Sequence, residues 1–251
     1  MKKAAEIVIY PVLAVALMLA VWAVAAAATG ESLLLPTPAE TAAAFVKLLK
    51  ARAFWVGTGN TFARAVVAYL VCLAASVLLA AAARIKPVRR LVSPVMTTVR
   101  SVPTMAVIFL LLLWTGARTA PVLVAVTVML PTMYSQFETA LDSANAGLGE
   151  MSDVYRVPKL RRFTMLYVPS LAPPLVSSAT FLSLGVKLVV AAEALAMTAS
   201  SLGILLMQAN VALETARLMA VALAAVIIGF IVEGLAALIK IPLKKRGFVF
   251  G

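Results

Sequence analysis

The chain has 251 residues, of which 63% are apolar and only 13% are charged. A soluble domain has roughly 45 to 50% apolar and about 25% charged residues, so the composition excludes an ordinary soluble protein. Lys and Arg number 22 against 10 Asp and Glu, which gives a net charge of +12. In a soluble protein this excess of positive charge would suggest nucleic acid as a partner. In a membrane protein it indicates which loops face the cytoplasm, so the positions of the charges along the chain decide between the two interpretations.

Several kinds of chemical site are excluded by the residues that the sequence lacks. There is no histidine, which rules out His-ligated metal sites and His general bases. Cys72 is the single cysteine, so disulfides and cysteine clusters within the chain are impossible. No GxxxxGK[ST] run provides a phosphate-binding loop. We therefore expect no catalytic, metal or cofactor site in this chain, and no enzyme activity.

Apolar stretches of about 20 residues, the length that crosses a bilayer, recur along the chain. The first exceeds the roughly 7 to 15 residues of a signal-peptide core, so it is predicted to be a retained span. The third is the least regular, since Arg100 and Pro103 lie in its first half. Residues 40–55 are predicted to form a separate amphipathic helix at the outer surface, lying at the membrane interface. The predicted fold is all-α, a polytopic membrane protein with one domain over residues 1–251 and six transmembrane helices, at 7–28, 62–83, 95–114, 120–140, 174–197 and 216–239.

The basic residues are distributed unevenly between the two sides that these spans define. With the N-terminus inside, most of them fall in cytoplasmic segments, which by the positive-inside rule places both termini in the cytoplasm. The net charge is thus a topology signal and nucleic-acid binding is disfavoured. The basic residues on the cytoplasmic side are Lys2, Lys3, Arg84, Lys86, Arg89, Arg90, Arg156, Lys159, Arg161, Arg162, Lys240, Lys244, Lys245 and Arg246.

The cytoplasmic loop at 142–171 is too long to be only a connector. Its first half predicts a short helix with one apolar face, because apolar residues recur at i, i+3, i+4 and i+7. A second short amphipathic helix follows Pro158. The pattern leaves two interpretations open, an anchor on anionic lipid or a docking surface for a soluble partner. The apolar face comprises Met151, Val154, Tyr155 and Pro158, and the polar face Glu150, Asp153 and Arg156.

Residues 150–169 read EMSDVYRVPKLRRFTMLYVP and resemble the EAA loop in permease subunits of bacterial ABC importers. Glu150 matches the glutamate of that pattern and Pro169 its proline. Met151 and Ser152 replace two alanines, and Arg156 stands where the family has glycine.

Two other segments carry the same resemblance more closely. SPVMTTVRSVPTMAVIFLLLLWTG, at 93–116, is similar to the third span of nitrate, sulfonate and taurine importer permeases. AAEALAMTASSLGILLMQA, at 191–209, is similar to the family's Ala-Glu and outer loop, with Ser201 in place of a glycine. Residues 61–64 also fit, and the resemblance covers about 36–245.

The resemblance implies the transmembrane subunit of an ATP-driven importer in the bacterial inner membrane. Such a subunit pairs with a second permease copy, identical or related, and receives its solute from an extracytoplasmic binding protein. Separate ATPase subunits, which hold ATP and Mg²⁺, would dock on the loop at 142–171. The solute would be a small anion such as nitrate or a sulfonate, or a sulfonate-bearing molecule like taurine, or alternatively a vitamin-related heterocycle.

Two other functional classes remain as alternatives. A secondary transporter would couple an ion to the substrate through Lys187 and Glu193, but the sequence lacks the internal symmetry that such proteins often show. A transport-dead partner subunit is suggested by the altered centre of the loop.

Charged residues inside the predicted spans are candidates for the substrate path. Lys187 and Glu193 lie about 240° apart around one helix at about 100° per residue, so each needs a partner elsewhere. Lys187 is either a cation that attracts an anionic solute or half of a structural ion pair, and Glu193 contacts substrate near the outer gate or only makes structural hydrogen bonds. Glu233 is expected to pair locally with Lys240. The remaining charges should snorkel from span ends; these are Arg64, Arg100 and Arg217.

Overall fold

The computed structural model describes residues 2–143, 151–152, 154–155, 157–158, 161 and 168–244. Within these ranges the chain consists of helices and loops, without a β-strand, as the sequence predicts. The helices are α1 (Lys2–Thr29), α2 (Pro38–Lys50), α3 (Arg52–Ala82), α4 (Lys86–Ser101), α5 (Thr104–Ser143), α8 (Val168–Ser170), α9 (Ala172–Ser177), α10 (Thr180–Ala196), α11 (Leu202–Val211) and α12 (Thr215–Lys244).

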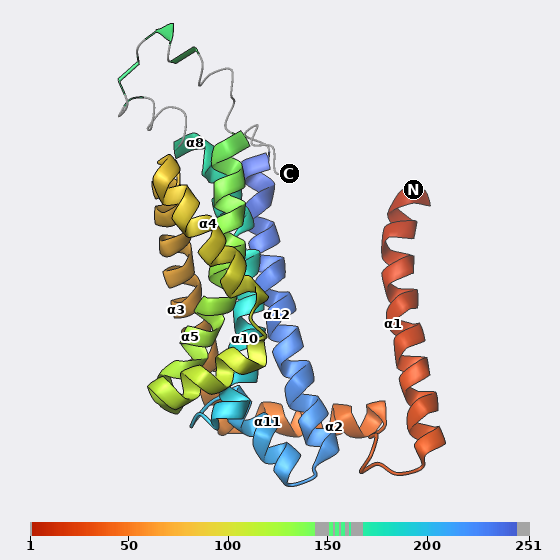
Figure 1. Cartoon of the computed structure of the whole chain (residues 1–251). Helices are drawn as coiled ribbons and strands as arrows, with labels where there is room; N and C mark the ends of the chain where they lie inside the picture. Colours follow the sequence, from red (N-terminus) through yellow and green to blue (C-terminus); the bar gives the residue numbers. More distant parts are fainter. Residues whose placement is uncertain are drawn as a thin grey trace.

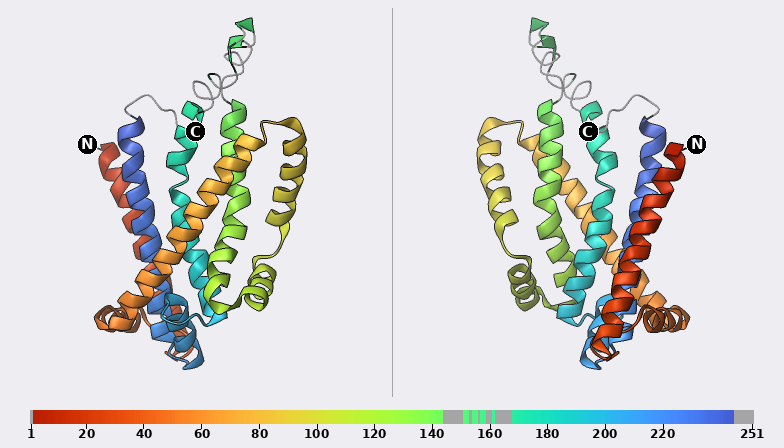
Figure 2. Two further views of the ribbon diagram at one scale, coloured as in Figure 1. Left: turned by 90° about the vertical axis from the view of Figure 1, so that its left-hand side faces the viewer. Right: turned by 90° about the vertical axis from the view of Figure 1, so that its right-hand side faces the viewer.

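The long helices run roughly alongside one another, while α2 and α11 lie across one end (Figure 1). Helix α1 stands apart from the others and meets them only near α2 (Figure 1). The start of α1 and the end of α12 lie at the same level, at the opposite end of the long helices, which also holds α8 (Figures 1 and 2). The two ends of the described chain therefore lie at the same end of the bundle, and that both termini face the cytoplasm stays a prediction.

Among the described residues, four helices are long and apolar enough to span a bilayer, namely α1, α3, α5 and α12. The segment Val168–Ser177 and helix α10 make a fifth candidate if the pair, bent by 48°, is one broken span. A sixth crossing stays a prediction. Helix α3 begins at Arg52, ten residues before the predicted second span, so the predicted outer helix at 40–55 is shorter and ends at Lys50.

The predicted third span, 95–114, is not a single helix. Helix α4 ends at Ser101, and α5 begins at Thr104. Pro103 explains the break, because proline lacks an N–H and disfavours the helical region for the preceding residue. Val102 is accordingly extended, with φ −73° and ψ 129°. A second break falls at Gly116, whose φ of 74° is accessible to glycine without strain, in the predicted turn between spans three and four.

Helix α2 has a well-defined start. Thr37 caps it by accepting a hydrogen bond from the Glu40 N–H, and the Glu40 carboxylate accepts one from the Thr37 N–H, which is a capping box. Pro38 occupies the first turn, where its missing N–H costs no hydrogen bond. Buried Leu48 then anchors α2 on the bundle, which holds this helix across the ends of the long helices.

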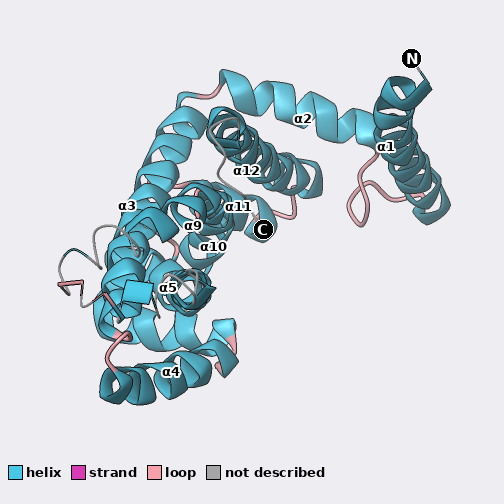
Figure 3. Ribbon diagram, turned by 90° about the horizontal axis from the view of Figure 1, so that it is seen from above, coloured by secondary structure: helices cyan, strands magenta, loops and turns pink. Residues whose placement is uncertain are grey.

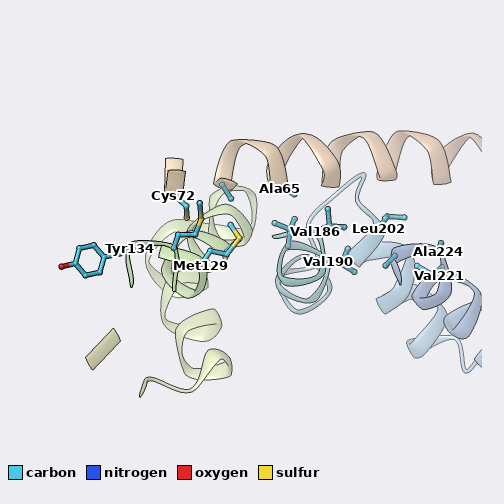
Figure 4. Packing of buried hydrophobic residues seen from close by; sticks show 14 of the residues in the cluster. Ala65, Cys72, Met129, Tyr134, Val186, Val190, Leu202, Val221 and Ala224 are labelled. Atoms are coloured by element: carbon cyan, nitrogen blue, oxygen red, sulfur yellow. The ribbon is translucent and has the colours of Figure 1, made fainter. Parts of the chain in front are cut away.

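Helix α10 occupies the middle of the bundle and contacts α3, α5, α11 and α12 (Figure 3). The core is drawn in Figure 4, where Met129 of α5 and Val186 of α10 lie among the buried side chains. Helix α3 contributes small buried residues about one turn apart, which permit close helix approach in membranes. These residues are Ala65, Ala68, Cys72, Ser76 and Ala80.

Candidate functional site

Glu193 of α10 is fully buried, and its carboxylate holds three helices together. Thr61 of α3 donates its hydroxyl proton to Oε2 at 2.7 Å, and Arg64 donates to Oε1 at 2.6 Å. The Gly203 N–H of α11 donates to Oε2 at 3.4 Å. We call Thr61, Arg64, Glu193 and Gly203 the Glu193 cluster. It lies where α11 crosses the bundle, at the end that the sequence predicts to be extracytoplasmic.

Further hydrogen bonds fix the loop before α11 on α3. The Leu202 N–H donates to Thr61 Oγ1 at 3.0 Å, so this hydroxyl both donates and accepts. The Asn60 amide donates to the Ser200 carbonyl at 2.8 Å, and Ser201 caps α11 by accepting from the Ile204 N–H. The backbone groups at the start of α11 are therefore satisfied by α3 and by the cap.

Two glycines permit this close packing. A Cβ on Gly57 of α3 would lie 3.0 Å from the Ser201 carbonyl oxygen. A Cβ on Gly203 would lie 2.4 Å from both the Glu193 Cβ and the Ala194 backbone nitrogen. Because these neighbours are backbone or next to it, they cannot rotate away, and only glycine fits at Gly203.

The Gly203→Ala variant is expected to loosen α11 from α10. Overpacking of this kind typically costs about 1 to 3 kcal/mol, and the clash here is with backbone. The apparent melting temperature of the purified protein in detergent should fall. The matched control is Gly59→Ala on α3, where a Cβ meets nothing within 4 Å; equal melting temperatures for the two variants would contradict the packing argument.

The Glu193 cluster corrects the expectation for Arg64, which was predicted to snorkel from a span end. Its guanidinium pairs with Glu193 instead, and its side chain is only 20% exposed. An unpaired carboxylate inside a membrane protein is costly, so burial at Glu193 requires this cation and the two further donors. Arg217, also predicted to snorkel, forms an exposed ion pair with Glu214 at 2.9 Å, and Arg100 is exposed on α4.

Lys187 of α10 faces α12 rather than the Glu193 cluster. Its Nζ lies 3.7 Å from Glu233 Oε1, and the two side chains are 47% and 41% exposed. Glu233 thus has an interhelical partner on α10, and its expected local pairing with Lys240, whose side chain lies outside the described part of the structure, stays a prediction. Lys187 and Glu193 each have a partner on another helix, as their separation around α10 requires.

A third charged group lies at the opposite end of the bundle, around the last turn of α5. Asp142 accepts hydrogen bonds from Arg84 and Arg89, both at 2.6 Å, and Glu138 pairs with Arg89 at 3.0 Å. Hydrogen bonding to Asp142 raises the pKa of the Arg89 guanidinium, so this cation stays charged. We call these four residues the Asp142 cluster. It joins α5 to α4 and to the turn after α3, directly before the predicted docking loop.

Part of the predicted docking loop lies outside the described residues, including Glu150, Asp153 and Arg156. The described part contains a helical turn, in which the Tyr155 N–H donates to the Met151 carbonyl at 3.0 Å. Met151, Val154 and Tyr155 are 53%, 79% and 74% exposed, and Pro158 is exposed as well. The described residues thus leave the predicted apolar face uncovered.

The sequence identified most of the charged residues of the site but not the residues that they pair with. The signal for Arg64 was available, because an arginine and a glutamate inside the same membrane domain favour pairing with each other. Glu138 and Asp142 were also visible as acidic residues one turn apart at the end of a predicted span. Nothing in the sequence pointed to the close approach of Gly229 on α12 to Ser183 and Lys187 on α10.

The fold and these clusters define a class, an α-helical membrane protein whose charged side chains pair between helices. The family described as binding-protein-dependent transport system inner membrane component matches residues 73–240, which is more than half of the chain. The chain belongs to this family. It is an inner-membrane permease component of a binding-protein-dependent transporter, which is not an enzyme family, and membership implies substrate-binding-protein and ATPase partners. No curated protein matches the sequence.

Proposed function

We propose that the chain is the transmembrane subunit of an ATP-driven importer and forms the translocation path for a small anionic solute. The observation that carries this proposal is the family match over residues 73–240, on a helical bundle with several apolar spans. The anionic class rests on Lys187, a cation within a membrane-spanning helix, and on the resemblance of residues 93–116 to nitrate, sulfonate and taurine permeases.

The ATPase subunits, which bring ATP and Mg²⁺, dock on the loop at 142–171. Exposure of Met151, Val154 and Tyr155 supports this, because apolar side chains on a short helix suit a groove in a soluble partner. The Asp142 cluster supports it too, since it ties the start of the loop to α4 and to the turn after α3. The remaining residues assigned to docking are Glu150, Asp153, Arg156 and Pro158.

The substrate path includes Lys187 and, nearer the binding protein, Glu193. Charged side chains at such depth mark solute pathways when they face water or the bundle interior. The oxygens of Glu193 are already bound by Thr61, Arg64 and Gly203. Its part in the path is therefore to position α11, while Lys187 is the group that meets the solute.

A second permease copy completes the path, and an identical copy is the simplest arrangement. Helices α4 and α5 support this, because they expose large apolar side chains around their junction. A path between two copies would place one Lys187 on each side.

Reconstitution tests this function directly. The chain is to be purified with the ATPase and binding protein from neighbouring genes and placed in proteoliposomes. We expect uptake of taurine, ethanesulfonate or nitrate that requires internal ATP and the binding protein. Uptake driven by an ion gradient without ATP would instead identify a secondary transporter, and ATPase binding without any uptake would identify a transport-dead partner.

A further inference from the structure

Helix α4 has a polar side that remains largely exposed in the described structure. The helix lies at the edge of the bundle beside α5, and Val92 and Met96 on its inner side pack against the core (Figure 3). At about 100° per residue, six polar residues fall within an arc of about 100° on another side of the helix. We call them the α4 polar face, and only Ser93 among them is partly buried: Lys86, Arg90, Ser93, Thr97, Arg100 and Ser101.

The α4 polar face runs from one end of the bundle into its interior. Helix α4 starts at the end that holds α8 and ends near the middle (Figures 1 and 2). At 1.5 Å per residue, Arg100 lies about 15 Å beyond Arg90 along the helix. That distance is half of the roughly 30 Å thickness of the hydrocarbon core. The position of Arg100 therefore disfavours the expected snorkelling, because the surface is too far for its side chain.

Arg100 has no counter-charge among the residues that the structure describes. Its side chain is exposed, and within these residues the guanidinium forms neither an ion pair nor a hydrogen bond. Arg64, by contrast, is paired with the buried carboxylate of Glu193. A lone guanidinium among lipid tails is costly, so Arg100 must contact water or polar groups of another chain.

The backbone is interrupted directly after Arg100. Between the end of α4 at Ser101 and the start of α5 at Thr104, Val102 and Pro103 are exposed. The last carbonyls of a helix lack an intrahelical donor, and irregular backbone occurs at membrane depth only where protein buries it or water reaches it. The break and the cation thus exclude lipid from the same region.

Direct contact with the same face of a second copy is disfavoured as well. A two-fold symmetric contact would place Lys86, Arg90 and Arg100 against the same three cations of the partner. Like charges that meet at an interface oppose association, and α4 itself contains no acidic residue to offset them. Water is therefore the environment that suits the α4 polar face.

Another side of α4 suits a dry environment. Leu91 and Val95 lie at least about 120° around the helix from Thr97, and their side chains are 73% and 55% exposed. Apolar side chains there can contact lipid or an apolar protein surface without cost. Helix α4 thus separates a wet side from a dry side.

We infer that the α4 polar face lines a water-filled part of the translocation path, and that Arg100 is the cation there that favours anionic solutes. A second copy of the chain supplies the opposite wall and leaves water between the two faces. Arg100 adds a cation to the path at a place other than Lys187. The inference rests on the proposed function, because it assigns selection among solutes to residues of that path.

Thiol modification tests the wet and dry sides without requiring transport. Thr97→Cys and Val95→Cys place thiols two residues apart, so their depths nearly match, but on different sides of α4. The native Cys72 is fully buried and should give little background. The complete complex in proteoliposomes is to be treated with a water-soluble methanethiosulfonate reagent on both sides of the membrane.

We expect Thr97→Cys to react at least about tenfold faster than Val95→Cys, because the reactive thiolate needs water around its charge. Equal rates would show that α4 does not divide a wet side from a dry side. An unreactive Thr97→Cys would show that protein covers the α4 polar face. Either result overturns the inference.

The charge of the reagent tests the role of Arg100. With Thr97→Cys, one helical turn from Arg100, an anionic reagent should be favoured over a cationic one by on the order of tenfold, because a cation in a confined space concentrates anions. Adding Arg100→Gln should bring the ratio of the two rates close to that of a small soluble thiol, whereas Arg100→Lys should keep it. Arg52→Gln removes the same charge from an exposed position at the start of α3 and should leave the ratio unchanged. An unchanged ratio in Arg100→Gln means that this residue does not select anions.

Uptake of ethanesulfonate tests Arg100 in the working complex. Arg100→Gln should lower kcat/KM by about tenfold, and Arg100→Lys and Arg52→Gln should stay close to the wild type. Normal uptake by Arg100→Gln would contradict the assigned role. If the wild-type complex takes up no anion at all, the proposed function fails, and the thiol rates still decide whether the α4 polar face is in water and whether Arg100 attracts anions.

Discussion

Glu193→Gln is expected to destabilise the protein more than any other single charge removal in the described structure. Glutamine keeps the shape of the side chain but leaves Arg64 without its counter-charge, and Arg64 is only 20% exposed. Breaking a buried ion pair costs about 3 to 5 kcal/mol, and the exposure of Arg64 favours the lower value. At about 2 to 4 °C per kcal/mol for this chain length, the apparent melting temperature should fall by roughly 6 to 12 °C.

Glu214→Gln provides the control for this measurement. Glu214 also pairs with an arginine, Arg217 at 2.9 Å, but both side chains are exposed, and surface pairs contribute about 0 to 1 kcal/mol. Its melting temperature should stay within about 3 °C of the wild type. Similar values for both variants would show that the Glu193 cluster does not hold α11 against α3.

Glu150→Arg is expected to abolish recruitment of the ATPase subunits. The loop at 142–171 already contains Lys159, Arg161 and Arg162. Reversing the charge of the glutamate that matches the EAA pattern removes an acidic contact and adds a repulsive one at a docking surface, and losses at such positions reach about 2 to 5 kcal/mol. Copurification of the ATPase in mild detergent should fall below about 5% of the wild-type amount, which corresponds to about 2 kcal/mol.

The matched control is Glu31→Arg, which makes the same charge change on an exposed residue at the α2 end of the bundle. Its ATPase content should be unchanged. An intact complex from the Glu150→Arg protein would rule out the assigned docking surface, whereas loss of ATPase from both variants would mean that net charge, rather than the loop, controls assembly.

Periodicity and hydropathy predicted the helical class and most of the long helices, because about 20 apolar residues in a row have few alternatives in a membrane. They failed at the third span, where the apolar stretch continues through Pro103 but the backbone does not. Hydropathy reports the environment of a residue and not its φ and ψ. Predicting the break between Ser101 and Thr104 would have required giving the conformational effect of proline more weight than the apolar composition.

The sequence predicted which charged residues belong to the candidate site, but not which residues they pair with. Angular separation around one helix showed that Lys187 and Glu193 need different partners, and the structure provides them on α12 and α3. Which partner each one finds depends on helix order in the bundle, which is a long-range property that local pattern does not contain. The sequence around Ser183 and Gly229 gives no sign that the two residues lie close together, because they meet only where α12 packs on α10.

Helix α3 is joined to its neighbours at two levels. About a third of the way along it Thr61 and Arg64 bind Glu193, and directly after its last turn Arg84 binds Asp142. At 1.5 Å per residue its 31 residues span about 46 Å, and no proline interrupts them. Such a helix acts mechanically as a strut, so a displacement of the docking loop should reach α11 as a rigid movement, with little loss to bending. Under the proposed function, α3 would therefore couple ATPase binding at one face of the membrane to the position of α11 at the other.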